Sequence, residues 1–331
     1  GDESDELDHN TITTVGALTF DKSNGAVATL GEALRIDDSG GNGVAQINGT
    51  AVFQDNLLLT GSGDSGTLDV QGDLTQENDP QGNPTFIIFS NVNGGSGKTL
   101  TGADSPELVE NVRVDNGSGN DVTLDNDVVF GDRLELLSGG IAVNGNDLVP
   151  DQGAQVVRSL GNGTSVANAG GGSFNGPGNS YDLTYRGGAA NVGLELSRDL
   201  NNLTVESGAT PQLIDQPQLT EDGVVNGVLT VESGAQIADD GSGARTLVLA
   251  GSEETHSIEG VVARANGNSV TLRTDGDNTT IEGSTDDANA ARIENLVVNA
   301  SGVAIDSDTP LQQIDGNVTV QEGDGLDLAL Y

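Results

Sequence analysis

The sequence predicts an all-β protein that folds as a single elongated parallel β-helix, or β-solenoid, with turns of about 22–26 residues. Three observations predict this fold class. The heptapeptide Leu-Thr-Val-Glu-Ser-Gly-Ala occurs at 203–209 and returns unchanged at 229–235, 26 residues later. The chain contains 49 Gly, six Phe and three Tyr, but no Cys, Met or Trp. Short runs of alternating apolar residues recur and end in Gly, Asn or Asp, which favour turns.

Looser copies of the heptapeptide keep its pattern of a short strand followed by a small-residue turn. With the two identical copies included, the spacings from copy to copy are 44, 22, 69, 26, 67 and 22 residues; the looser copies begin at Leu68, Val112, Leu134, Leu296 and Val318. The long gaps are close to multiples of 22 or 23, so we expect the copies to stack. The inward positions expected to form continuous columns are Leu203, Val205, Leu229, Val231, Leu296 and Val298.

The composition suits a narrow core of Val, Leu, Ile and Ala, because globular enzymes and sandwiches usually depend on large aromatic side chains. A repeat array grows by stacking, so we expect one solenoid domain over 11–331. Residues 1–10 form an acidic tail with too little apolar surface to order alone. Excursions from the stack are predicted near 76–84 and 159–180, and Ser105–Glu110 carries the Ser and Pro of a helix start.

The formal net charge is −39, from 51 acidic residues against two Lys and ten Arg. This balance excludes nucleic acid as a partner, since a phosphate backbone requires a basic patch. A large acidic surplus is typical of extracellular or high-salt settings, where counterions screen the repulsion. No run of 18 apolar residues could span a membrane. The chain begins at Gly1 without Met, which we interpret as a removed leader or a fragment; both interpretations fit export.

The segment Asp132–Leu148, and more weakly the two heptapeptides, resembles the β-solenoid repeats of secreted bacterial or archaeal surface proteins. These include filamentous-haemagglutinin, autotransporter-passenger and Bacteroidetes-type adhesin regions. The similarity covers about two thirds of the chain, chiefly 112–148 and 191–330. It implies a parallel β-helix exposed outside the cell, and it assigns no catalytic residues.

Two glycine-rich motifs have a binding and a structural interpretation. Gly94–Thr99 matches the end of a phosphate-binding loop, but Val92 stands where the first Gly belongs and no helix is expected to follow; a turn between strands is favoured. Gly117–Leu124 partly matches the calcium-binding nonapeptide of β-rolls, although only one copy occurs and its apolar residue is out of phase. A structural calcium ion therefore stays an alternative to a protein without cofactors.

Acidic pairs could hold a hard cation where two turns converge, or they could simply be solvated turns. The pairs are Asp37 with Asp38, Asp239 with Asp240, Asp275 with Asp277, Asp286 with Asp287, and Asp306 with Asp308.

The sequence offers no clear catalytic group. His9 and His256 lie in the tail and in a polar segment, so we expect both on the surface. Tyr181 and Tyr185 alternate with Leu183 on one face, which favours core or wall residues over a sugar platform. Seven Asn-x-Ser/Thr sequons would matter only in a source that glycosylates Asn; they begin at Asn48, Asn116, Asn162, Asn202, Asn278, Asn299 and Asn317.

These observations predict a structural, non-enzymatic protein of the cell surface or extracellular matrix, either a filament subunit or an adhesin segment. The expected partners are further copies of the chain, joined head to tail, and a surface polysaccharide. A parallel β-helix leaves an unpaired strand at each end, and no polar cap is evident. The predicted subunit contact comprises Thr11, Ile12, Val15, Leu326, Leu328, Leu330 and Tyr331. A carbohydrate-active β-helix enzyme and a calcium-dependent binding module stay open as alternatives.

Overall fold

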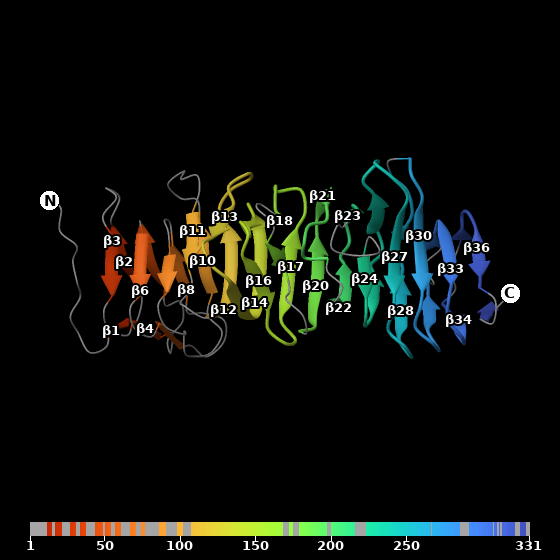
Figure 1. Cartoon of the computed structure of the whole chain (residues 1–331), viewed down its shortest axis with the longest axis horizontal. Coiled ribbons are helices and arrows are strands. Elements are labelled where there is room, and N and C mark those ends of the chain that lie inside the picture. Colours follow the sequence, from red (N-terminus) through yellow and green to blue (C-terminus); the bar gives the residue numbers. More distant parts are fainter. Residues whose placement is uncertain are drawn as a thin grey trace. The chain divides into compact units, whose positions relative to one another are not determined.

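A computed structural model describes the backbone of the strands up to residue 101, and then residues 107–167, 172–174, 179–196, 200–215, 223–265, 267–284, 291–306, 308–309, 311, 313–321 and 325–328. Side chains are described at Phe89, at 98–101 and from residue 111 onward within those ranges, except at Leu328. The chain divides into two compact units, 1–155 with 162–179 and 156–161 with 180–331. Each is a stack of parallel strands without a helix among the described residues, as the sequence predicts (Figure 1).

The first unit contains three sheets. The largest is formed, in order of pairing, by β2 (Ala17–Asp21), β5 (Val44–Asn48), β8 (Thr67–Val70), β10 (Phe86–Ser90), β12 (Glu107–Asp115) and β14 (Val128–Ser138), with β16 (Asp147–Pro150) and β19 (Ser173–Phe174) beyond β14. The second is formed, again in order of pairing, by β18 (Val166–Ala167), β15 (Ile141–Ala142), β13 (Val122–Leu124), β11 (Lys98–Thr101), β9 (Leu74–Gln76), β6 (Thr50–Phe53) and β3 (Val27–Leu30). The third is formed by β1 (Ile12–Thr14), β4 (Leu34–Asp37) and β7 (Leu57–Thr60).

The second unit also uses three sheets, and β17 (Gln155–Ser159) contributes Val156–Ser159 to it. Its first sheet continues with β20 (Tyr181–Arg186), β22 (Leu200–Val205), β25 (Leu229–Val231), β28 (Thr255–Ile258), β31 (Thr280–Glu282), β34 (Val303–Ile305) and β37 (Leu326–Leu328). The six-stranded sheet is β21 (Gly188–Asn191), β23 (Ala209–Leu213), β26 (Gln236–Asp239), β29 (Val261–Val262), β32 (Arg292–Ile293) and β35 (Gln313–Ile314). The five-stranded sheet is β24 (Gly223–Val225), β27 (Arg245–Leu249), β30 (Val270–Thr274), β33 (Asn295–Val298) and β36 (Val318–Val320).

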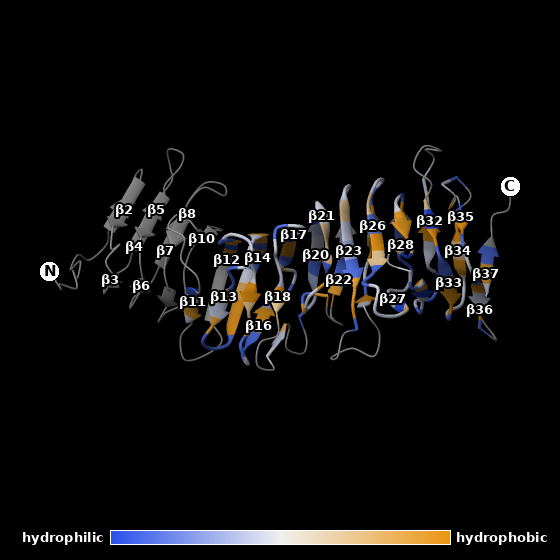
Figure 2. Cartoon of the chain, turned by 90° about the horizontal axis from the view of Figure 1, so that it is seen from above, coloured by the Kyte–Doolittle hydropathy of each residue, from blue (hydrophilic) through white to orange (hydrophobic). Residues whose placement is uncertain are grey.

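The core of the second unit consists of inward-facing columns, because alternate residues of a strand point to opposite faces. Leu203 and Val205 pair in register with Leu229 and Val231 of the next turn. All four are at most 2% exposed, as are Leu296 and Val298, so the inward assignment of these six residues is confirmed. Hydrophobic residues follow the strands of this unit, and hydrophilic residues gather in the turns (Figure 2).

The repeated heptapeptide encodes one strand and the turn that follows it. In both copies the Ala N–H donates over 2.9 Å to the Glu carbonyl, Ala209 to Glu206 and Ala235 to Glu232. The intervening Gly208 and Gly234 have φ of 79° and 80°. A positive φ at the third residue is what a type II turn requires, and Gly adopts it without strain. The 26-residue spacing of the copies is therefore one turn of the solenoid.

The spacing argument holds for some copies and is wrong for others. Leu68 reaches Val112 through Ile87, so the 44-residue gap is two turns of one column, and Leu134 follows next. Leu296 and Val318, however, lie in the five-stranded sheet, whereas Leu229 lies in the first sheet of the unit. The 67-residue gap ends on another face because turns differ in length: registered steps in the first sheet range from 23 to 27 residues.

Two further expectations concern irregular segments. Ser105 and Pro106 are outside the described residues, but 107–110 belong to β12, so the predicted helix start is wrong. Glu107 pairs in register with Val128, and this ladder along the neighbouring turn outweighs the local capping signal. Within 159–180, β18 and β19 each pair with a strand of the preceding turn, and Phe174 is 2% exposed and contacts Phe130.

Candidate functional site

A polar groove of about 430 Å³ opens on the outward face of the five-stranded sheet in the second unit. Three of its strands, β30, β33 and β36, form the floor. The outward position follows from alternation, since the flanking residues Val270, Leu272, Leu296 and Val298 are buried. The lining includes Arg264, Thr271, Glu294, Asn295, Val297 and Thr319. The groove therefore combines hydroxyl, amide and guanidinium groups with a single apolar side chain.

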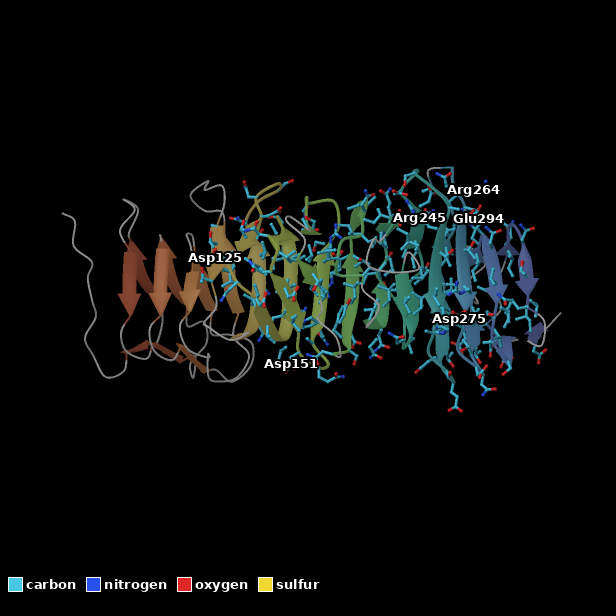
Figure 3. The ribbon with its side chains drawn as sticks, in the orientation of Figure 1. Asp125, Asp151, Arg245, Arg264, Asp275 and Glu294 are labelled. Carbon is cyan, nitrogen blue, oxygen red and sulfur yellow. The ribbon has the colours of Figure 1, made fainter. Side chains whose placement is uncertain are left out.

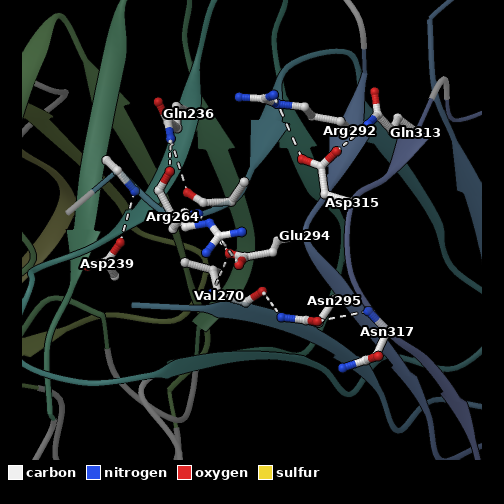
Figure 4. Close-up of polar contacts among 12 residues, drawn as sticks. Gln236, Asp239, Arg264, Val270, Arg292, Glu294, Asn295, Gln313, Asp315 and Asn317 are labelled. Atoms are coloured by element: carbon white, nitrogen blue, oxygen red, sulfur yellow. Dashed lines mark hydrogen bonds and ion pairs between the residues drawn. The ribbon is translucent and has the colours of Figure 1, made fainter. Parts of the chain in front are cut away.

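Asn295 links three successive turns below the groove. Its Nδ2 donates to the carbonyl of Val270 over 3.4 Å, and its Oδ1 accepts from the N–H of Asn317 over 3.0 Å (Figure 4). These bonds fix the amide, so the floor is held by the strand stack itself. The hydroxyls of Thr271 and Thr319 and the side-chain amide of Asn317 make no hydrogen bond to any described residue, and they are available to a ligand.

Glu294 and Arg264 form one wall of the groove (Figure 3). Glu294 is buried, and its Oε2 accepts from the N–H groups of Arg264 and Val270, each over 2.9 Å. Its Oε1 lies 3.3 Å from Nε of Arg264, whose side chain is 61% exposed. The carboxylate is thus held by two backbone donors and neutralised by one guanidinium. Glu294 is the one carboxylate in the described lining, whereas glycoside hydrolysis ordinarily uses two.

A buried ionic cluster lies in the core of the same unit. Nη1 of Arg158 bonds Oε1 of Glu195, and Nη2 donates to the carbonyl of Asn191 over 2.8 Å. Oε1 of Glu195 also accepts from the hydroxyl of Tyr185 over 3.1 Å, and the hydroxyl of Tyr181 donates to the Glu195 carbonyl over 2.6 Å. Burial raises the pKa of Tyr185 well above its ordinary value, and the charge of Glu195 adds to the shift.

The cluster confirms that Tyr181 and Tyr185 are core residues, since both are fully buried. The pairing of Arg158 with Glu195 was not predicted. The available signal was a charged residue at an inward position of an otherwise apolar strand, as Arg158 follows Val156 and Val157. Such a residue needs a partner across the core.

His256 contradicts its predicted surface position, because it is fully buried. It belongs to β28 and faces inward directly after Leu229, whose N–H donates to its Nδ1 over 3.0 Å. Nε2 has no partner among the described residues. Burial lowers the pKa of His256 to about 4. The polar residues around it in the sequence, which suggested a turn, are the outward positions of the strand.

The sequence motifs for phosphate and calcium resolve into turns and strands where they are described. Lys98 and Thr99 lie in β11 rather than at a helix start, and Lys98 is 3% exposed. In the calcium-like motif, Val122 and Leu124 are buried in β13, and Gly117 and Gly119 form the preceding turn with positive φ. No group of three or more His, Cys, Asp or Glu that could hold a metal occurs among the described residues.

The described acidic pairs take part in local hydrogen bonds. Asp239 accepts from the N–H groups of Gly241 and Ala265, and Asp240 pairs with Arg245 over 2.9 Å. Other members bond within their turns or to the next turn: Asp275 with Arg273, Asp277 with Ser301, and Asp306 with Thr309. These backbone hydrogen bonds lower the pKa of Asp277 and of Asp306. Asp38, Asp286 and Asp287, and the side chain of Asp37, lie outside the described residues.

The predicted subunit contact is only partly described. Leu326 and Leu328 belong to β37, where they pair with Val303 and Ile305, and the side chain of Leu326 is half-buried. Ile12 belongs to β1, with its side chain outside the described set. Thr11, Val15, Leu330 and Tyr331 also lie outside the described residues, as do 1–10 and 77–85.

The sequons differ in accessibility. Asn116 is fully buried, with Nδ2 donating to the Asn120 carbonyl, and Asn202 is half-buried against Asp182. Those with exposed Asn are Asn162, Asn278, Asn299 and Asn317. Asn48 lies in β5, with its side chain outside the described set.

No family model matches the chain, and neither the curated proteins nor the solved structures contain a match. Within the described residues, no helix has the length and apolarity needed to cross a membrane.

Proposed function

We propose that the protein is an exported structural protein of the cell surface or extracellular matrix, whose solenoid stacks end to end with further copies into a filament. The single observation that supports this role is the apolar edge formed by β36. Val318 and Val320 are 44% and 43% exposed. Their registered partners on the preceding turn, Leu296 and Val298, are fully buried.

This edge offers both elements of a strand-addition contact. β36 pairs with β33 on one side, and no described strand occupies its other side. Its free backbone groups can pair with a further strand, and its inward valines can be covered by the column of a further turn. A second copy fits because successive turns of this chain already pair in this register. Head-to-tail contacts of this kind do not close, so they propagate.

The proposed contact places Leu326, Leu328, Leu330 and Tyr331 of one copy against Thr11, Ile12 and Val15 of the next. Because the net charge is −39, copies repel one another until salt screens them. Assembly is therefore expected to require both high protein concentration and high salt.

The test is sedimentation velocity and negative-stain microscopy of three proteins in about 1 M NaCl: the full chain, the Val318→Lys/Val320→Lys variant and the Thr319→Lys variant. The full chain and Thr319→Lys should form filaments, because Thr319 faces outward on the same strand. The double variant should stay monomeric with an unchanged β-sheet spectrum. A full chain that stays monomeric at all concentrations would exclude the proposal, and so would equal assembly of all three proteins.

A further inference from the structure

We propose that the groove on the five-stranded sheet binds a neutral oligosaccharide chain laid across β30, β33 and β36. This inference is independent of end-to-end stacking, since it concerns the outward face of the sheet and not its edge. It assigns to this surface a ligand class, and it makes the structural rod a carbohydrate-binding one.

The lining has the chemistry that hydroxyl-rich ligands need. Sugar hydroxyls both donate and accept hydrogen bonds, and the groove presents free groups of both kinds: the Thr271 and Thr319 hydroxyls and the Asn317 amide. Val297 lies among them and offers an apolar surface for the C–H face of a sugar ring. A volume of about 430 Å³ lies within the range of small-ligand sites.

The groove also suits a ligand that repeats along its length. Thr271 and Asn295 are registered neighbours on adjacent strands, and the N–H of Asn317 continues the series by bonding Asn295. Neighbouring strands are about 4.8 Å apart, so polar groups recur at this interval along the stack. A chain of similar units running parallel to the stack therefore meets similar groups at each turn.

Charge selects against acidic polysaccharides. Arg264 is the one cation in the described lining, and its charge is compensated by Glu294. A polyanion would also approach a protein of net charge −39 against long-range repulsion. A neutral chain meets no such barrier. Glu294, held by two backbone N–H groups and Arg264, serves as a fixed wall, so the groove binds without a paired acid for bond cleavage.

The experiment combines saturation-transfer NMR and titration calorimetry with four neutral probes, namely tetrasaccharides of β1,4-glucose, β1,3-glucose, α1,4-glucose and β1,4-N-acetylglucosamine. Tetragalacturonate is the charged comparison. At least one neutral probe should bind with Kd of about 1 mM or tighter, as expected for an open groove, and tetragalacturonate should not bind.

The decisive variant is Thr271→Val, which keeps the side-chain shape and removes one free hydroxyl. Binding should weaken about three- to tenfold with an unchanged melting temperature. The matched control is Thr230→Val, an outward threonine on β25 in another sheet, which should bind like the unmodified protein. The proposal is overturned if no neutral probe binds, if tetragalacturonate binds as well as the neutral probes, or if both variants bind equally.

Discussion

His256 follows Leu229 in the inward column of the second unit and accepts a hydrogen bond from the Leu229 N–H at its Nδ1 over 3.0 Å. This bond requires the neutral imidazole, because a protonated ring has no acceptor. The column above and below is aliphatic: Leu203 pairs with Leu229, and Ile281 pairs with His256. The turn is therefore stable only while His256 is uncharged.

This relationship predicts a loss of stability on mild acidification. The folded pKa of His256 is about 4, below the ordinary 6.5. Above pH 6.5 both states are neutral at this residue. Between pH 6.5 and 4 the unfolded chain binds the proton first, so the free energy of unfolding should fall by up to about 3 kcal/mol. Denaturant unfolding at pH 7.0, 6.0, 5.0 and 4.5 measures this effect.

The matched variant is His256→Leu, which removes the titration and extends the aliphatic column. It leaves the Leu229 N–H without its acceptor, a cost of about 1–3 kcal/mol at neutral pH. The stability difference between the two proteins should therefore shrink as the pH falls through this window. A difference that is constant with pH would show that His256 is not buried as the neutral form.

The inward column predicts opposite outcomes for two neighbouring substitutions. Val231→Asp places an unpaired carboxylate in a fully buried position and should destabilise the protein by at least about 3 kcal/mol. Glu232→Lys changes an exposed residue whose Oε2 accepts from the Ser207 N–H, and it should cost about 1 kcal/mol or less. Thermal unfolding compares them, and similar melting temperatures would contradict the inward assignment.

The buried pair of Arg158 and Glu195 should show strong energetic coupling. Arg158→Met leaves the Glu195 carboxylate uncompensated in the core, at a cost of about 3–5 kcal/mol. Adding Glu195→Gln removes that charge while keeping an acceptor for the Tyr185 hydroxyl, so the double variant should regain more than about 1 kcal/mol over Arg158→Met. A double-mutant cycle by denaturant unfolding measures the coupling. Additive losses would show that the two residues do not act as a pair.

Salt should raise the melting temperature. The 51 acidic residues repel one another, and the screening length falls from about 30 Å at 0.01 M to about 3 Å at 1 M salt. Calorimetric scans in NaCl over this range measure the effect, with sucrose at equal osmolality as the control for solvent exclusion. A melting temperature that does not change with NaCl would remove the high-salt interpretation.

The sequence by itself determined the fold class, the inward residues of the repeated strands and the turns between them. These features are local: alternation assigns a residue to one of two faces, and the Gly of each heptapeptide permits the positive φ of its turn. The distance from Leu203 to Leu229 is one turn, so a single repeat could be recognised from spacing alone.

Only the tertiary structure decided which sheet a distant copy joins and which polar residues are buried. Leu296 lies on another face than Leu229 because the turns between them differ in length, and these differences accumulate along the chain. His256, Arg158 and Glu195 are inward because of their strand register. The partner of Arg158 comes from a segment 37 residues away, and the groove likewise gathers Thr271, Asn295 and Asn317 from three turns. Such contacts depend on the path of the whole coil, which local patterns do not specify.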